Sequence, residues 1–202
     1  MESMAPAVSV SLLDFLRTGV FGAVRWGLSR AELEALLGTP DGTANRSRRD
    51  RHPTVFVYGD FEFYIAPQDD LLYAVHCDNF SVPRGNAMLA VEPWILRYGL
   101  PLVEAEAGLM AEGIAFRKSD AADAVRLYAE SGASLTFSTD DAARGLVAVS
   151  RWNDAVLSAH EPERNVSLTL TDREIAALRQ EAARRGVSLA RLCADWIRER
   201  LN

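Results

Sequence analysis

One short run of this sequence combines three side chains that are able to do chemistry. His76, Cys77 and Asp78 place a thiol between an imidazole and a carboxylate, the groups that activate a nucleophile. Neighbouring residues of a strand point to opposite faces of a sheet, so these side chains do not meet directly. We therefore favour a buried structural role for Cys77 or His76, with a catalytic role as the alternative.

Two pairs of carboxylates also suggest chemistry. Asp69-Asp70 and Asp140-Asp141 fall at the expected tips of hairpins. Paired carboxylates bind metal ions or transfer protons, but aspartate is also common in turns because its side chain hydrogen-bonds to nearby backbone. Turn formation is the favoured interpretation.

The sequence has no pattern typical of a metal, nucleotide or serine-hydrolase site. The histidines, at positions 52, 76 and 160, and the cysteines, at positions 77 and 193, have none of the spacings of zinc ligands. Glycine-rich phosphate-binding loops and the nucleophile elbow G-x-S-x-G do not occur. We expect no metal, no cofactor and no enzymatic activity.

Residues 45–52 form a basic loop within an acidic region. Its arginines are Arg46, Arg48, Arg49 and Arg51. Guanidinium groups suit carboxylate or phosphate partners, so the loop is a candidate contact for an acidic partner. A solvated loop without a partner is the alternative.

Aromatic residues in the expected strands suggest a protein-binding surface. If one face of the sheet is free, the aromatic side chains on that face form a patch for a protein partner. Because half of each alternating strand must face the core, we expect most of them to pack inside. The candidates are Phe56, Tyr58, Phe61, Phe63, Tyr64 and Tyr73.

The charge is divided unevenly along the chain. The 202 residues are 49% apolar with a net charge of −6, which excludes a protein coated all over with nucleic-acid-binding charge. Residues 164–202 carry eight arginines and five acids, a net charge of +3, so residues 1–163 carry −9. We expect two domains, 1–160 and 161–202, joined by a polar, proline-containing junction.

The sequence also predicts where the protein works. Two cysteines are too few for a disulfide-stapled secreted scaffold. The N-terminal apolar runs are shorter than the core of a signal peptide, and no stretch approaches a membrane span. We expect a cytoplasmic protein that makes no contact with a membrane.

The acidic body contains an internal repeat, in which a helix is followed by alternating strands bounded by Gly and Asp turns. The two units cover about residues 10–80 and 87–153. In the first, Ser29 is a suitable N-cap and Gly38 a suitable helix end. The expected helices cover residues 10–17, 29–38, 87–98 and 102–113.

The strands of each unit predict an antiparallel meander. Joined edge to edge, the two meanders make one sheet with helices on one face and the other face free. The fold class is therefore α+β: a tandem helix plus antiparallel-meander repeat forming one sheet, followed by a small strand-helix-helix module. The expected strands cover residues 54–58, 61–65, 72–77, 114–117, 125–128, 134–137 and 146–150.

The segment WGLSRAELEALLGTP, Trp26–Pro40, resembles the opening of the α/β units in the β-lactamase-inhibitor protein and the outer-membrane assembly lipoproteins. The likeness covers this short segment alone. Those relatives are mostly exported and bind other proteins through the sheet. The resemblance implies the architecture of the unit, and we carry over the architecture alone.

The C-terminal segment predicts a small strand-helix-helix module. Residues 165–170 alternate strictly and predict a half-buried strand. A capping box at residues 171–174 opens a helix, Gly186 ends it, and Ser188 caps the next. So small a module needs a second copy to bury its apolar faces, so we expect a homodimer through residues 165–201.

The segment VSLTLTDREIAALRQEAARRGVSLARL, residues 166–192, resembles the ribbon-helix-helix family of dimeric repressors and antitoxins. In that family a two-stranded ribbon reads bases in the major groove of DNA. The resemblance implies that Asn165, Ser167 and Thr169 read bases and that Ser188 binds a phosphate. The outward strand face carries no Lys or Arg, so dimerisation alone, or packing on the body's own sheet edge, is the alternative.

Taken together, these patterns predict a homodimeric, non-enzymatic DNA-binding regulator or antitoxin-like protein whose body binds an effector or a protein. The alternative is an immunity- or inhibitor-like protein-binding module whose tail only dimerises. The two hypotheses differ in whether the tail contacts DNA.

The unpaired strand at residues 165–170 yields a test of the dimer. Light scattering of the full chain should find two chains per particle, because the strand and the apolar helix faces need a partner. Deletion of residues 163–202 should leave a folded monomer. A monomeric full chain, or a truncated body that unfolds, would contradict the dimer.

Overall fold

A computed structural model describes residues 8–48, 50–121, 123–140 and 144–153, together with residues 178, 181 and 185. Contacts divide the chain into two compact units, Met1–Glu161 and Pro162–Asn202. In the second unit the three described residues are helical, and Arg185 Nε lies 2.6 Å from Glu181 Oε1. The elements that follow belong to the first unit.

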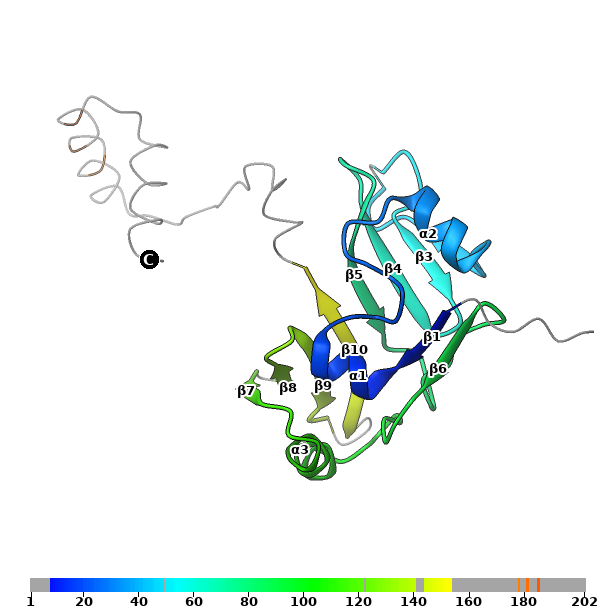
Figure 1. Cartoon of the computed structure of the whole chain (residues 1–202). Helices are drawn as coiled ribbons and strands as arrows, with labels where there is room; N and C mark the ends of the chain where they lie inside the picture. Colours follow the sequence, from blue (N-terminus) through cyan, green and yellow to red (C-terminus); the bar gives the residue numbers. More distant parts are fainter. Residues whose placement is uncertain are drawn as a thin grey trace, which may run out of the picture. The chain divides into compact units, whose positions relative to one another are not determined.

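The first unit is built on an eight-stranded antiparallel sheet (Figure 1). Its strands are β2 (Gly42–Ala44), β3 (Val55–Tyr58), β4 (Phe61–Ala66), β5 (Leu71–Cys77), β7 (Phe116–Asp120), β8 (Ala124–Ala129), β9 (Ala133–Ser138) and β10 (Gly145–Trp152). Their order across the sheet is β2-β3-β4-β5-β10-β9-β8-β7, with β5 paired to β10 at the centre. The predicted combination of helices with an antiparallel sheet is confirmed.

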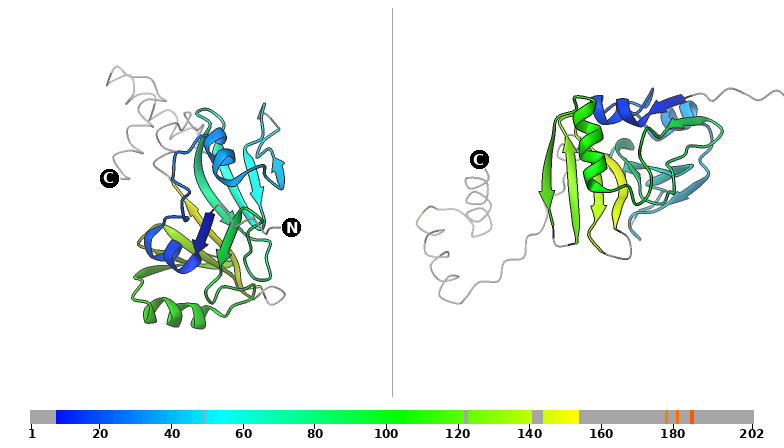
Figure 2. Two further views of the ribbon diagram at one scale, coloured as in Figure 1. Left: turned by 45° about the vertical axis from the view of Figure 1, so that its right-hand side comes forward. Right: turned by 90° about the horizontal axis from the view of Figure 1, so that it is seen from below.

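The described residues of the first unit form three helices, α1 (Leu12–Thr18), α2 (Arg30–Leu37) and α3 (Leu102–Ala111). At the start of α2, Ser29 Oγ accepts the backbone N–H of Glu32, and the Glu32 carboxylate accepts the N–H of Ser29 at 2.8 Å. All three helices bury apolar side chains in one core, and Figure 2 gives two further views of them against the sheet. Within the described ranges, no helix is long and apolar enough to cross a membrane.

A short parallel pair of strands, β1 (Val8–Ser11) and β6 (Leu89–Glu92), lies outside the main sheet. The prediction of a helix at residues 87–98 is therefore wrong. Leu89 is buried in the core, and β1 supplies the hydrogen-bonding partner that the local sequence does not reveal. Pro93 follows directly and disfavours a helical conformation in the residue before it.

Alternation along each strand divides the side chains between two faces of the sheet. In β4, Phe61, Phe63 and Ile65 enter the core that the helices share. Glu62 and Tyr64, from the same strand, lie on the opposite side. We call the first side the covered face and the second the open face.

Most of the aromatic candidates for a protein-binding patch lie on the covered face, as alternation predicts. Tyr64 and Tyr73 instead form a small cluster with Ala66 and Ala74 on the open face. The aromatic residues buried in the main core are Phe56, Tyr58, Phe61 and Phe63.

The covered face also carries a charged side chain, Arg151 of β10. Its Nη1 donates to the carbonyl oxygen of Gly19, just after α1, and its guanidinium lies 4.8 Å from the centre of the Trp26 ring. Burial lowers the pKa of this guanidinium. Nearby, Ser131 Oγ donates to the carbonyl oxygen of Leu16 at 2.7 Å, so α1 is fastened to the second half of the sheet.

Gly59 lies in the turn between β3 and β4, which packs closely against the backbone of Arg84. It has a φ of +63°, and a Cβ there would lie 2.5 Å from the carbonyl oxygen of Arg84. Gly27 has a φ of +81° with nothing within 4 Å, and is the matched control. Urea unfolding of Gly27→Ala should show a loss of about 1 kcal/mol for the left-handed conformation.

Gly59→Ala should lose a further ~1–3 kcal/mol, because the new methyl group collides with backbone that cannot rotate away. Equal losses for the two variants would mean that the contact between Gly59 and Arg84 is not maintained.

Candidate functional site

A row of polar side chains crosses the open face from strand to strand. His76 of β5 pairs with Glu62 of β4 on one side and with Ser150 of β10 on the other. Ser150 pairs with Ser134 of β9, and their hydroxyl oxygens are 3.1 Å apart. Tyr128 of β8 continues the row beyond Ser134. The register of the sheet therefore brings together residues from both halves of the unit.

An aromatic patch lies beside this row. The ring of Trp152 is centred 5.1 Å from that of Tyr64, 5.9 Å from that of Tyr73 and 6.3 Å from that of His76. Tyr73 is buried, whereas Trp152 is 37% exposed at the surface of the cluster. We call these four residues the aromatic patch.

The hydroxyl groups of the two tyrosines are held by charged neighbours. Tyr64 donates to the Glu62 carboxylate at 2.5 Å, and Arg46 Nη1 donates to the Tyr73 oxygen at 2.7 Å. Burial, and after it the bond to Glu62, raises the pKa of Tyr64 well above its ordinary value. Burial also raises the pKa of Tyr73, against the opposing effect of Arg46. Both phenols are therefore neutral at physiological pH.

Hydrogen bonds hold the basic loop in place. Asp50 Oδ2 accepts the backbone N–H of Ser47 at 2.8 Å and the hydroxyl of Thr54 at 3.1 Å. The N–H of Arg46 donates to Thr54 Oγ1 at 2.9 Å. The loop before β3 is thus hydrogen-bonded to Thr54, the residue that directly precedes that strand.

The arginines predicted to contact an acidic partner lie next to the aromatic patch. Arg46 reaches Tyr73, as described, and its side chain is exposed together with those of Arg48 and Arg51. Arg49 lies outside the described residues. The structure therefore joins the basic loop to the tyrosines, two features that the sequence presented separately.

A groove continues the open face beyond Trp152. It has a volume of about 530 Å³, with Tyr128 and Trp152 among its walls and Ser134 between them. The Arg117 guanidinium lies 4.0 Å from the centre of the Tyr128 ring, within the range of a cation–π contact. Glu130 also lines the groove, so it presents both signs of charge.

The structure separates the thiol and the imidazole that the sequence places side by side. Cys77 is fully buried on the covered face, and burial raises the pKa of its thiol far above the ordinary value. His76 lies on the open face, with Nε2 3.2 Å from Asp78 Oδ2. Its Nδ1 is buried without a hydrogen-bond partner among the described residues. A thiol–imidazole pair is not formed.

The first of the two carboxylate pairs lies in a turn. Asp69 and Asp70 lie in the β4–β5 turn, where Asp70 has a φ of 60° and pairs with Arg30 at 2.8 Å. The N–H of Asp140 donates to Ser138 Oγ at 3.1 Å, and Asp141 is outside the described residues. Within the part of the chain that is described, no group of three His, Cys, Asp or Glu side chains is placed to hold a metal ion.

Sequence reasoning missed Trp152, His76 and Tyr128 as parts of one surface. The predicted strand at residues 146–150 stops short of Trp152, which is the last residue of β10. Two more residues of alternation place Trp152 on the same face as Ser150, and this extension was the available signal. The pairing of β5 with β10 was needed to bring it to the tyrosines.

Comparisons with known proteins return weak likenesses. No family model and no curated protein sequence matches the chain. One similar structure is an extracellular protein containing a SCP domain from Bacillus anthracis, with 13% identity over 73% of this chain and a TM-score of 0.35. Another is a cysteine-rich secretory protein from Staphylococcus aureus, with 12% identity over 77% of this chain and a TM-score of 0.33. This chain covers 50% and 57% of those two chains.

These comparisons correct several predictions from the sequence. The two family resemblances, the DNA-binding regulator and the cytoplasmic location are withdrawn, because the comparisons support none of them and the matched structures are an extracellular and a secretory protein. The immunity- or inhibitor-like alternative gains no specific support. With TM-scores below 0.5, the matches in turn assign this chain neither a fold nor a function.

Four residues were predicted to contact DNA. They are Asn165, Ser167, Thr169 and Ser188, and all four lie outside the described residues. The predicted dimer surface, residues 165–201, lies outside them apart from residues 178, 181 and 185.

The burial of Cys77 leads to a test of its chemistry. In a Cys193→Ser variant, the remaining thiol should not react with Ellman's reagent at pH 8, because it is buried and held protonated. After unfolding in guanidinium chloride it should react completely. Rapid reaction in the folded protein would restore the nucleophile hypothesis.

Proposed function

We propose that the chain is a non-enzymatic binding protein, and that the open face of its sheet binds a protein partner. The observation that carries this proposal is the exposed ring of Trp152 on a patch of packed aromatic side chains, with Arg46 hydrogen-bonded at its edge. An exposed aromatic cluster on a soluble domain is typical of an interaction site.

The composition of this surface favours a protein partner. Trp, Tyr and Arg are the residues that contribute most to binding energy at protein interfaces. The patch is already packed before binding, and Tyr64 and Tyr73 are held by Glu62 and Arg46, so little side-chain entropy is lost on association.

The charges beside the patch favour an acidic partner segment with apolar side chains. Arg46, Arg48 and Arg51 are exposed on the basic loop. The nearby carboxylates have internal partners, since Glu62 accepts from Tyr64 and Asp78 lies 3.2 Å from the His76 imidazole. The basic loop is therefore the side of the patch that suits carboxylates.

The absence of catalysis is part of the same proposal. It is supported by the separation of the Cys77 thiol from the His76 imidazole on opposite faces of the sheet. The carboxylates of Asp69 and Asp70 belong to a turn.

We further infer that the body consists of two tandem units. α2 is followed by the meander β2–β5, and α3 is followed by the meander β7–β10. The last strands of the two meanders, β5 and β10, pair with each other. The proposed binding surface therefore forms where the two meanders join. The strand-helix-helix tail and the homodimer stay predictions.

Peptide display tests the proposed surface without a known partner. Selection of a random peptide library on the full chain should enrich sequences that combine Asp or Glu with apolar residues. Trp152→Ala should weaken binding of the selected peptides by about 30-fold, the effect of losing ~2 kcal/mol at a hot spot. Arg46→Ala should weaken binding and reduce its dependence on salt.

Tyr98→Ala is the matched control, because Tyr98 is an aromatic residue that is 47% exposed outside the patch and the groove. It should leave peptide affinity unchanged. The proposal fails if no acidic sequences are enriched, or if the selected peptides bind the Trp152→Ala variant as well as the original chain.

A further inference from the structure

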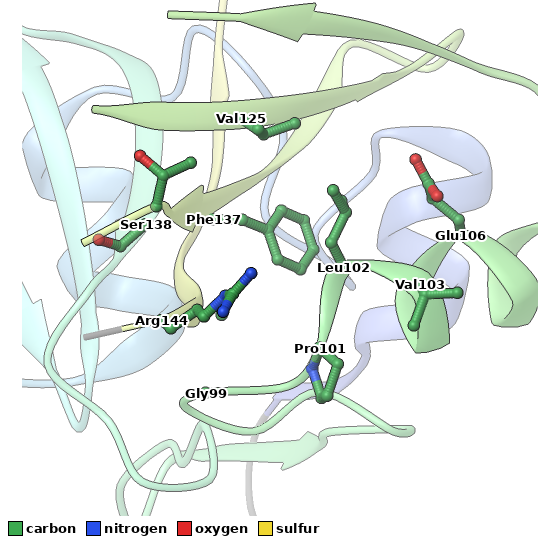
Figure 3. A pocket seen from close by; sticks show the side chains of 11 residues that line it. Gly99, Pro101, Leu102, Val103, Glu106, Val125, Phe137, Ser138 and Arg144 are labelled. Carbon is green, nitrogen blue, oxygen red and sulfur yellow. The ribbon is translucent and has the colours of Figure 1, made fainter. Parts of the chain in front are cut away.

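A cavity separate from the open face lies where the first turn of α3 meets the ends of β8, β9 and β10 (Figure 3). Its volume is about 590 Å³, within the range of small-molecule sites in proteins. Leu102 and Val103 come from α3, Val125 from β8 and Phe137 from β9. These side chains give the cavity apolar walls.

The described lining of this cavity contains one cation, Arg144, and one anion, Glu106. Lys118 Nζ lies 3.1 Å from Glu106 Oε1, so the anion already has a partner. Arg144 is exposed, and Figure 3 shows its guanidinium and Leu102 on opposite sides of the Phe137 ring. The charge presented to an occupant is therefore positive.

Close backbone packing holds this end of the cavity. The N–H of Gly99 donates to the carbonyl oxygen of Leu146 at 2.8 Å, and the N–H of Leu146 donates to that of Leu100 at 2.9 Å. A Cβ on Gly145 would lie 2.5 Å from the carbonyl oxygen of Gly99. Glycine at position 145 lets the start of β10 pack closely against the backbone at Gly99. This packing fixes the backbone next to Arg144, from which the arginine side chain extends.

We propose that this cavity binds a carboxylate attached to an apolar chain. Arg144 pairs with the carboxylate at the rim, and Leu102, Val103 and Phe137 enclose the chain. An apolar amine is disfavoured, because Arg144 repels it and Glu106 is engaged by Lys118. An uncharged apolar molecule is also disfavoured, because it cannot form an ion pair with the Arg144 guanidinium.

Three probes with the same tail test the head group. Octanoate, octanol and octylamine are titrated into the full chain by calorimetry, with the methyl resonances of Leu102, Val103 and Val125 followed by NMR. Octanoate should bind most tightly and shift these methyl resonances. Octanol should bind at least ten times more weakly, and octylamine should show no binding.

Two variants test the roles of individual residues. Arg144→Gln should weaken octanoate binding by about ten-fold and leave octanol unchanged, while Arg144→Lys should retain most of the affinity. Val103→Asp should abolish octanoate binding, since it adds a negative charge to the wall. Val103 is 70% exposed, so its replacement does not disturb the core.

Glu106→Gln is the control for charge in general, and it should not weaken octanoate binding. The proposal is overturned if octanoate leaves the three methyl resonances unshifted, if octylamine binds as tightly, or if Arg144→Gln binds octanoate unchanged.

A carboxylate attached to an apolar group occurs both in free metabolites and at the C-terminus of a peptide. Acetyl-Ala-Leu with a free carboxylate and its C-terminal amide separate these sources. Tighter binding of the peptide acid than of octanoate, together with loss of binding in the amide, supports a chain terminus as occupant. Tighter binding of octanoate supports a small molecule.

Discussion

The pairing of β5 with β10 decides which side of the sheet each central side chain takes. Cys77 faces Val149 in the core, and the next pair, His76 and Ser150, faces the other way. A slip of one residue would move every side chain of a strand to the opposite face. It would bury an imidazole and expose a thiol. Both the core and the aromatic patch therefore depend on this one register.

The open face and the cavity near α3 use the same sheet in different ways. On the open face, Ala74, Ser134 and Ser150 are small and buried, and the ring of Trp152 packs against Tyr64, Tyr73 and His76 beside them. Beside α3, the sheet contributes Phe137 to a cavity that has Arg144 in its lining. The two proposed sites therefore differ in form, since the first is a surface and the second is a cavity.

Local patterns were sufficient to predict seven of the eight strands of the main sheet and the helix that Ser29 caps, because alternation and capping act over a few residues. The three-residue edge strand β2 was not predicted. Local patterns also failed at residues 87–98, where the strand β6 exists through its pairing with β1, 81 positions earlier in the register of Val8 with Leu89. The site was predictable in pieces. Tyr64, Tyr73 and the arginine loop were visible as candidates. The hydrogen bond from Arg46 to Tyr73 joins residues 27 positions apart, so local patterns do not predict it.

The bond from Arg151 to the carbonyl of Gly19 joins residues 132 positions apart, and that from Ser131 to Leu16 joins residues 115 positions apart. The order of synthesis therefore matters. α1 leaves the ribosome more than 100 residues before the groups that fasten it, since the bonds span 115 and 132 positions. Contacts so distant in sequence slow folding, since the loop must close before they form. Until residues 131 and 151 are made, α1, which buries Phe15 in the core, lacks the two hydrogen bonds that fasten it to the second half of the sheet.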